Sequence, residues 1–351
     1  MQAAQARQAP AWPTSAGLVA GAVLDRLVPD PRRGHPVALF GSAAARLERA
    51  LYAPSRARGG LFCAVAVGAA AGVGAVLDRA FGSVRERARR KRITGTAGRS
   101  SPSIASAPTS AAAATATAVA TAAGTWAALG GAMLAREAEA IADALDAGDL
   151  DEARRRLPGL CGRDPSVLDE KGIARATVES VAENTSDAVV APLVWGALLG
   201  LPGLLGYRAA NTLDAMVGHR SERYERFGAP SARLDDVANW APARLTALLA
   251  CAAAPIVGGD PRRAARVAAR DGRNHPSPNS GHCEAAFAGA LDLRLGGANR
   301  YGDRVEHRPE LGEGRHPEPD DIRRAVALAR AVDAGAAAVA AAVAALPGGR
   351  K

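Results

Sequence analysis

Carboxylate and amide side chains recur at helical spacing in three stretches of this sequence, and these residue types suit metal and phosphate chemistry. In 171–187, KGIARATVESVAENTSD, Glu179 and Glu183 lie one helical turn apart. The polar run that follows consists of Asn184, Thr185, Ser186 and Asp187. Two carboxylates one turn apart suit a hydrated Mg²⁺. The alternative is an amphipathic helix with salt bridges, whose polar end caps the next helix.

The second stretch, 208–220, reads RAANTLDAMVGHR and ends at Arg220. It places Arg208, Asn211 and Asp214 at i, i+3 and i+6, on one side of a helix. Such a polar stripe on a helix that leaves a lipid bilayer is costly to maintain without a use. We therefore predict a functional role for this stripe.

The third stretch carries Asp235 and Asp236, with Asn239 one turn after Asp235. Its alternative is a helix N-terminus at which acidic residues are favourable. A shorter motif, the turn GHPV that contains His35, directly follows the first apolar stretch. Prolines make this turn rigid, and its alternative is an ordinary solvated loop.

A stiff polar loop, RDGRNHPSPNSG at 270–281, precedes a predicted helix that begins near Glu284. Its donors and acceptors are Arg270, Arg273, His275, Ser277, Asn279 and Ser280. Asn279 or Ser280 can cap the helix. A helix N-terminus behind a loop with two arginines and a histidine is a natural anion site. The alternative is a purely structural loop.

The elements that must position these residues alternate with long uncharged segments. Residues without charge fill 59–77, 100–135, 188–207, 245–259 and 334–349. A membrane span needs roughly 20 mainly apolar residues, so two or three of these segments qualify and the others are marginal. Alanine-rich helices buried in a soluble protein are the alternative. Strand signals are scarce, so the chain is predicted to be mostly helical.

The predicted fold is all-α: a polytopic membrane protein with helical hairpins and sizeable polar loops. Pro202 followed by Gly203 breaks 188–207, so two short helices in a hairpin fit as well as one span. We predict a flexible N-terminus at 1–15 and a single membrane-embedded helical domain at 16–350. Within it, 78–110 is predicted to be a disordered, basic, low-complexity loop. The basic residues of this loop favour a position in the cytoplasm. If the apolar segments before and after the loop pair as one hairpin, however, the loop lies outside the cell.

Composition excludes several classes of protein. The formal net charge is +9, and 41 of the 44 basic residues are arginines, which suit phosphate and carboxylate. Aromatic residues make up only 4%, and neither zinc-finger spacing nor an RNP-like motif occurs, so nucleic acid is not an expected partner. The four cysteines form no C-x-x-C pair, and no P-loop or cleavable signal is visible.

Taken together and in this order, these motifs resemble the CobD/CbiB family of cobalamin (vitamin B12) biosynthesis. The resemblance rests on KGIARATVESVAENTSD, YRAANTLDAMVGHRSERYERFG, ARLDDVANWAPARLTAL and RDGRNHPSPNSG followed by EAAFAGAL, with GHPV near the N-terminus. It runs from about residue 17 to 330. Ala188 stands where glycine is common, His282-Cys283 stands where an aromatic residue and proline are frequent, and the 78–110 loop is expanded.

The resemblance implies an adenosylcobinamide-phosphate synthase, a multi-pass enzyme of the cell (inner, cytoplasmic) membrane. Such an enzyme joins (adenosyl)cobyric acid to aminopropanol or its phosphate through an amide at one corrin propionate. It is described as an ATP-dependent ligase that releases ADP and phosphate, so the implied cofactors are ATP and Mg²⁺ and the implied partners are the corrinoid, the amine and the lipid bilayer.

On this basis each candidate residue receives an expected role. The expected catalytic residues are Glu179, Glu183, Asp187 and Asp214, and the expected Mg²⁺ ligands are Glu183, Asp187, Asp235 and Asp236. The expected substrate and phosphate contacts are His35, Asn184, Thr185, Ser186, Asn211, Arg220, Asn239, Arg270, Arg273, His275, Ser277, Asn279, Ser280 and Glu284.

Two other classes of function remain open from the sequence. A membrane transporter or channel for a small anionic solute predicts polar residues at mid-membrane. Here the long apolar segments lack charges and the polar motifs lie at their ends, which favours an enzyme at the membrane edge. A soluble alanine-rich helical module that binds an anionic partner is the third alternative.

Overall fold

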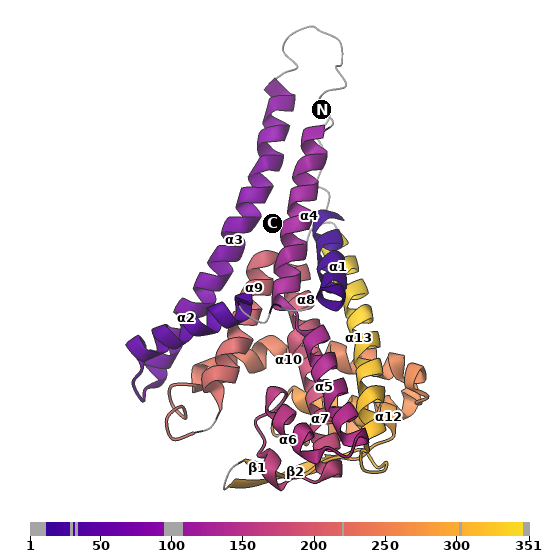
Figure 1. Cartoon of the computed structure of the whole chain (residues 1–351). Coiled ribbons are helices and arrows are strands. Elements are labelled where there is room, and N and C mark those ends of the chain that lie inside the picture. The colour runs from indigo at the N-terminus through magenta and orange to yellow at the C-terminus, as the bar shows by residue number, and fades with distance from the viewer. Residues whose placement is uncertain are drawn as a thin grey trace.

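An upper bundle of nearly uncharged helices stands on a charged lower body in this computed structural model (Figure 1). The structure describes residues 12–28, 31, 34–94, 108–219, 221–301 and 304–346. In the upper bundle, α4 (Pro108–Ala128) packs between α1 (Trp12–Leu27) and α3 (Arg56–Thr94), and α1 also contacts α13 (Pro319–Ala345). Small side chains fill these helices, so their axes approach closely.

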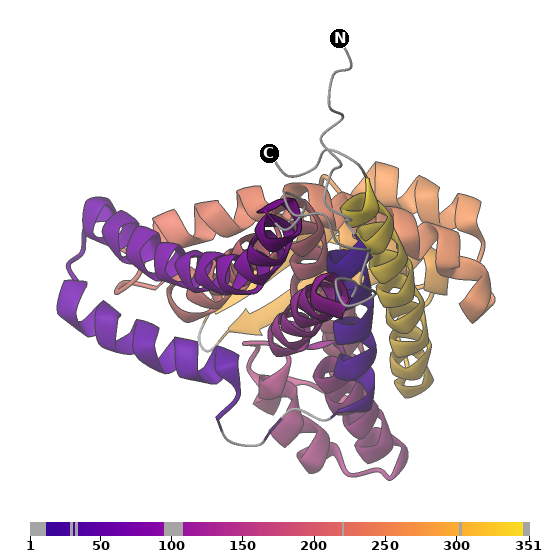
Figure 2. The ribbon, with the colours of Figure 1, turned by 90° about the horizontal axis from the view of Figure 1, so that it is seen from above.

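Within the described residues, four helical segments are long and apolar enough to cross a membrane, as the sequence predicts. They are Arg56–Phe81, Ala111–Asp146, Ala229–Val257 and Pro319–Ala345. Figures 1 and 2 show that the third, which contains α10 (Ala229–Ala253), lies across the direction of α3 and α4 rather than beside them. The mostly helical fold class is thus confirmed, and the candidate spans do not all run in one direction.

The predicted break within 188–207 is present as a tight helical hairpin. α8 (Ala191–Leu199) ends at Gly200, whose φ of 70° lies in the left-handed region that favours glycine, and α9 (Leu201–Leu213) begins at once. A Cβ on Gly203 would lie 2.4 Å from the Trp195 carbonyl oxygen, so only glycine allows this close return. α9 then packs along α3.

The lower body consists of shorter elements around a common core. They are α2 (Pro36–Leu51), α5 (Gly131–Asp146), α6 (Leu150–Arg156), α7 (Glu170–Thr185), α11 (Pro261–Asp271) and α12 (Ser280–Leu291), with 3₁₀ turns at Leu157–Gly159, Pro165–Val167 and Ala254–Val257. Asp169 begins α7 by accepting the Gly172 N–H at 2.8 Å. The main core joins α5, α6, α7, α11 and α12 to α13, whereas α2 packs through Ala44 in a second, smaller core with α3 and α9.

One antiparallel hairpin departs from the predicted all-helical chain. β1 (Leu295–Tyr301) pairs with β2 (Arg304–Leu311), with an irregularity between Leu295 and Gly297. Its sequence, LGGANRY, is rich in glycine and polar residues and carries no alternating apolar pattern, which explains why sequence periodicity did not indicate it. The hairpin lies at the lower end of the molecule (Figure 1).

The predicted loop at 78–110 is partly helical. α3 continues to Thr94 and α4 begins at Pro108, so both ends of this segment are helix rather than loop, and 95–107 lie outside the described residues. At the N-terminus, α1 begins at Trp12, within the predicted flexible segment of 1–15. Residues 1–11 also lie outside the described part.

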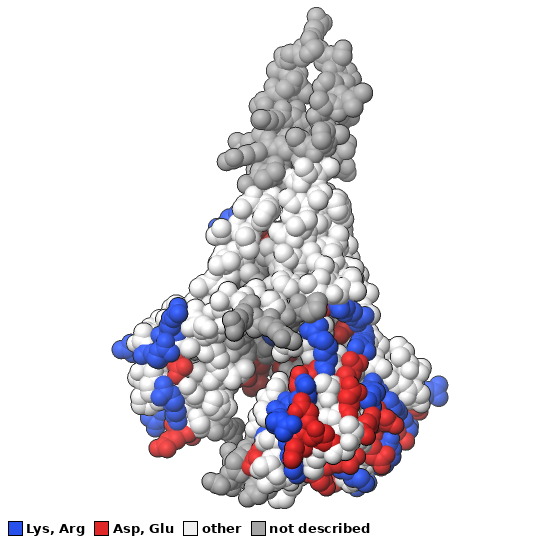
Figure 3. Space-filling model, in the orientation of Figure 1, with Lys and Arg blue, Asp and Glu red and all other residues white. Residues whose placement is uncertain are grey.

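Charge is sharply segregated over the described surface. Figure 3 shows charged side chains gathered on two lobes at the lower end, a hollow between these lobes, and a nearly uncharged zone above them. Large apolar side chains are exposed on helices of the uncharged zone, for example Val65 and Val76 of α3 and Val119 of α4. This pattern is typical of a helical membrane protein with polar domains at one face.

Candidate functional site

Two π-helical turns place the central acids of the site. The chain forms a π-turn at Ser186–Val190, after α7, and another at Asp214–Gly218, after α9. Asp187 lies in the first turn and Asp214 in the second. A π-turn inserts one residue into a helix, which redirects the side chains around it and is frequent at functional sites. A Cβ on Gly218 would overlap Asp214 Oδ1, so glycine makes room for this carboxylate.

Amide side chains link Asp235 of α10 to polar residues of α9 in one network. Asn239 donates to Asp235 Oδ2 at 3.0 Å and accepts from the Tyr207 hydroxyl at 2.8 Å. Asn211 donates to Asp235 Oδ1 at 3.3 Å and accepts from Arg208 at 3.2 Å. Both oxygens of the buried Asp235 are therefore held by amide donors, so this carboxylate keeps a fixed orientation.

Five carboxyl groups form the acid cluster, which we define as Glu183, Asp187, Asp214, Asp235 and Asp236. Burial, then the charges of Asp235, Asp236 and Glu183, raises the pKa of Asp214 to about 7. Burial, then the charges of Asp235, Glu183 and Asp214, raises the pKa of Asp187 well above its usual range, and Arg208 opposes this shift. The cluster therefore holds protons near neutral pH.

The polar loop at 270–281 closes over α7 and joins the acid cluster. Ser280 donates its hydroxyl to Glu183 Oε1 at 2.6 Å. Asn279 is the N-cap residue of α12, as predicted, but its side chain makes no cap hydrogen bond; the Ser277 hydroxyl accepts the N–H groups of Asn279 and Ser280, at 3.3 and 3.2 Å. Asn279 instead uses its side chain to bridge the Asp236 carbonyl and Arg244, at 2.8 and 2.9 Å.

This loop also contributes one member of a buried pair of titratable side chains. His275 Nε2 is 3.7 Å from Glu284 Oε1 and 3.2 Å from Arg308 of β2. Burial and the charge of Arg308 lower the pKa of His275, whereas burial, then Glu179 and Glu183, raises the pKa of Glu284. Glu284 is 1% exposed, and its Oε2 has no hydrogen-bond partner.

Comparison with known proteins identifies the family. The family model described as "CobD/Cbib protein" matches residues 18–329. The chain belongs to the CobD/CbiB family. "Cobalamin biosynthesis protein CobD" of Mycobacterium tuberculosis (strain ATCC 25618 / H37Rv) is 51% identical over 330 residues, which cover 94% of this chain and 96% of that protein.

Two further relatives carry the same name. That of Geobacter metallireducens is 43% identical over 310 residues, covering 87% of this chain and 89% of its own length. That of Rhodobacter capsulatus is 53% identical over 197 residues, covering 56% of this chain and 62% of its own length. No solved structure matches the chain. Membership in this cobalamin biosynthesis family gives the site its biological setting.

Not every residue expected from the CobD/CbiB resemblance joins the cluster. Glu179 is 2% exposed and pairs with Arg163, and its Oε1 accepts the Gly296 N–H at 2.7 Å. Both carboxylate oxygens of Glu179 are thus engaged in contacts that stabilise the fold. Asn184 and Thr185 donate back to carbonyls of their own helix, at 2.9 and 2.6 Å.

Other expected contacts lie at the margin of the site. Arg270 pairs with Asp271, and Arg273 is exposed. Ser186 is buried beside the acid cluster. His35 accepts the Val37 N–H at 3.3 Å as the N-cap of α2 and lies edge-on to Trp126, at a centroid distance of 6.2 Å. Arg220 lies outside the described residues.

Magnesium has suitable donors here but no preformed cage. The carboxylates of the acid cluster and the amide oxygens beside it are oxygen ligands of the kind that Mg²⁺ prefers. Among the described residues, however, no three acidic, histidine or cysteine side chains are placed to bind one ion directly. The cluster therefore fits a hydrated Mg²⁺ held by one or two carboxylates, with the remaining ligands coming from water and substrate phosphate.

Several residues that matter in the structure were absent from the predicted site. Tyr207, Arg208 and Arg244 contact the amides of the network, and Arg163 neutralises Glu179. Arg208 stands inside the second polar stretch and Tyr207 directly precedes it, so their place next to the motif was a usable signal. Arg163 lies 16 residues before its partner, and no local spacing links the two.

Proposed function

We propose that this chain is a membrane-embedded amide ligase of the adenosylcobinamide-phosphate synthase type. It would join the propionate carboxylate of (adenosyl)cobyric acid to the amine of aminopropanol or its phosphate. The observation that carries the proposal is the acid cluster next to the 270–281 loop, in a chain of the CobD/CbiB family. An acid cluster for metal-bound phosphates and a polar loop for anions are what such a ligase requires.

The chemistry explains why both parts are needed. A carboxylate does not acylate an amine at neutral pH, because its oxygen is a poor leaving group. Transfer of the ATP γ-phosphoryl group to the carboxylate gives an acyl phosphate and ADP. The amine nitrogen then attacks the carbonyl carbon, the C–O bond to phosphate breaks, and the nitrogen loses a proton. A carboxylate whose pKa lies near 7, as for Asp214, is suited to accept that proton.

The remaining roles follow from position. In this proposal one or two carboxylates among Glu183, Asp187, Asp235 and Asp236 would hold a hydrated Mg²⁺, which offsets negative charge on the nucleotide phosphates. Ser277, Asn279 and Ser280 present polar groups over the same cluster, and Arg244 brings a positive charge to Asn279. Asn211 and Asn239 fix the orientation of Asp235.

The membrane location belongs to the same proposal. Four segments are long and apolar enough to span, and the uncharged zone of Figure 3 lies directly above the lobes that flank the hollow. With the uncharged zone in lipid, the acid cluster lies at the water-facing edge, where polar substrates can reach it.

A direct assay tests the proposal. The protein purified in detergent is mixed with cobyric acid, aminopropanol phosphate, ATP and Mg²⁺, and amide formation is followed by mass spectrometry. We expect Glu183→Gln and Asp214→Asn to lower turnover at least about 100-fold, as for loss of a catalytic group. Glu170→Gln, an exposed acid on α7, is the matched control and should leave turnover unchanged. Full turnover by both cluster variants would refute the acid-cluster assignment.

A further inference from the structure

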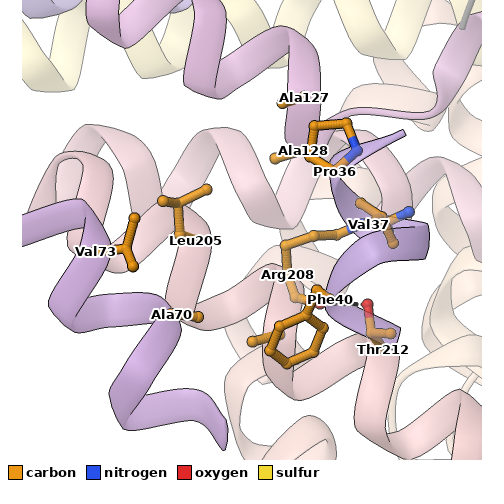
Figure 4. Close-up of a pocket in the computed structure, with 11 residues that line it drawn as sticks. Pro36, Val37, Phe40, Ala70, Val73, Ala127, Ala128, Leu205, Arg208 and Thr212 are labelled. Atoms are coloured by element: carbon orange, nitrogen blue, oxygen red, sulfur yellow. Dashed lines mark hydrogen bonds between the residues drawn. The ribbon is translucent and has the colours of Figure 1, made fainter. Parts of the chain in front are cut away.

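An apolar cavity adjoins the acid cluster on the other side of α9. It has a volume of about 220 Å³ and lies between α2, α3, α4 and α9 (Figure 4). Its lining residues are Pro36, Val37, Phe40, Ala70, Val73, Ala127, Ala128, Leu205, Arg208, Ala209 and Thr212. All but Arg208 and Thr212 are apolar, so the cavity presents one cation on an apolar wall.

Arg208 connects this cavity with the acid cluster. Its side chain runs along the cavity toward Pro36 and Val37 at the start of α2 (Figure 4). On the other side, its Nη1 donates to Asn211, and its charge lowers the pKa of Asp187. A Cβ on Gly130 would lie 3.9 Å from Arg208 Nη2, so the guanidinium also passes the start of α5.

The cavity has the chemistry of a site for an anionic group carried on an apolar body. A guanidinium binds a carboxylate through two parallel hydrogen bonds, and an apolar wall strengthens this pair by excluding water. A water molecule takes up roughly 30 Å³ in the liquid, so about 220 Å³ holds roughly seven waters or one edge of a large ring. A free phosphate or a nucleotide phosphate would leave the apolar wall unused.

We propose that this cavity binds the methyl-bearing edge of the corrin ring and that Arg208 pairs with the propionate carboxylate that is to be amidated. The inference rests on the proposed function. It assigns to Arg208 the positioning of the acceptor carboxylate, and to α2, α3 and α9 the recognition of the corrinoid. α9 then separates two subsites: its Ala209 side faces the ring, and its Asn211 side faces the acid cluster.

Binding of cobyric acid without ATP tests this inference apart from catalysis. The corrinoid is coloured, so equilibrium dialysis against the purified protein gives Kd from visible absorbance. Ala70→Leu fills the cavity from α3 and should raise Kd at least tenfold. Ala69→Leu, the exposed neighbour on the same helix, is the matched control and should change Kd less than twofold. Equal Kd values for the two variants would overturn the cavity as the corrin site.

The carboxylate contact has its own test. Wild-type protein should bind cobyric acid at least tenfold more tightly than cobinamide, in which the same position is already an amide. Arg208→Gln should abolish this preference. Arg208→Lys keeps the charge but cannot form two parallel hydrogen bonds with a carboxylate, so it should keep part of the preference. A preference that survives in Arg208→Gln would overturn the assignment of Arg208. If wild-type protein binds neither corrinoid, the proposed function itself fails.

Discussion

Individual carboxylates in this protein have two opposite roles that their residue type does not reveal. Asp187 and Asp214 lie in π-turns among other acids, and the pKa of each is raised. Glu179, on the same helix as Glu183, is neutralised by Arg163 and holds the β-hairpin through Gly296. Burial and neighbouring negative charges raise the pKa of the first group, whereas both oxygens of Glu179 have partners.

Asp214 makes a pH-dependent contribution to stability. Its pKa rises from 3.8 to about 7 on folding, so the folded state holds the proton more tightly than the unfolded state. Its contribution is therefore present at low pH and lost as pH rises through about 7, with a slope of up to about 1.4 kcal/mol per pH unit. Asp214→Asn removes this loss.

Thermal unfolding in detergent at pH 5 and pH 8 measures the effect. We expect the melting temperature of Asp214→Asn, relative to wild type, to be higher at pH 8 than at pH 5 by at least about 2 °C. Glu170→Gln serves as the control and should show no such difference, because Glu170 is exposed. A pH-independent difference would contradict the raised pKa.

The buried pair of Arg163 and Glu179 makes a second prediction. Arg163→Met leaves the buried Glu179 carboxylate with only the more distant Arg175, 4.0 Å from its Oε1, as a charge partner, which costs about 3 kcal/mol in the free energy of unfolding. Adding Glu179→Gln to this variant should recover part of the loss, because the uncompensated charge is gone while a side-chain oxygen remains for the Gly296 N–H. Chemical denaturation measures both. A double variant no more stable than the single one would argue against charge burial as the cause.

At the scale of elements, small residues decide how the helices of the upper bundle pack. Gly17 and Gly21 of α1 face Thr121 and Thr125 of α4, and a Cβ on either glycine would lie within 2.5 Å of the facing threonine Cβ. Small residues four apart are a common means of close helix contact in membranes. Only the packed structure reveals which of the many glycines serve this purpose.

This contact predicts opposite outcomes for two glycine-to-alanine changes. Gly21→Ala should destabilise the protein by about 1–3 kcal/mol, because overpacking outweighs the better helix propensity of alanine. Gly68→Ala on α3, where no atom lies within 4 Å of the added Cβ, should be neutral or stabilising. Thermal unfolding in the same detergent compares them. Equal effects at the two positions would show that α1 and α4 are not packed as described.

At the scale of the whole molecule, the uncharged zone and the charged lobes form two layers. Site residues from α7, α9, α10 and α12 meet in the charged layer, although they are spread over about a hundred residues of sequence. The α8–α9 hairpin makes this meeting possible because it returns the chain toward α7.

Membrane fractionation tests the layered arrangement. Because the exposed side chains of the uncharged zone are apolar, we expect the protein to stay in the membrane pellet after high-salt and carbonate washes and to be released by detergent. A peripheral protein expressed alongside is the control that the washes should release. Release of this chain by salt without detergent would contradict the membrane location.

The sequence by itself determined the helical fold class, a break near Pro202-Gly203 that the structure places at Gly200, five polar motifs and the family resemblance. These follow from local patterns: charge spacing, helix breakers and motif order. Only the tertiary structure decided that Glu179 pairs with Arg163, that the Ser277 hydroxyl accepts the first N–H groups of α12, that Arg208 joins a cavity to the acid cluster, and that 295–311 form a hairpin. The reason is physical: each depends on which distant segments are brought into contact, and burial and neighbouring charges exist only once the chain has packed.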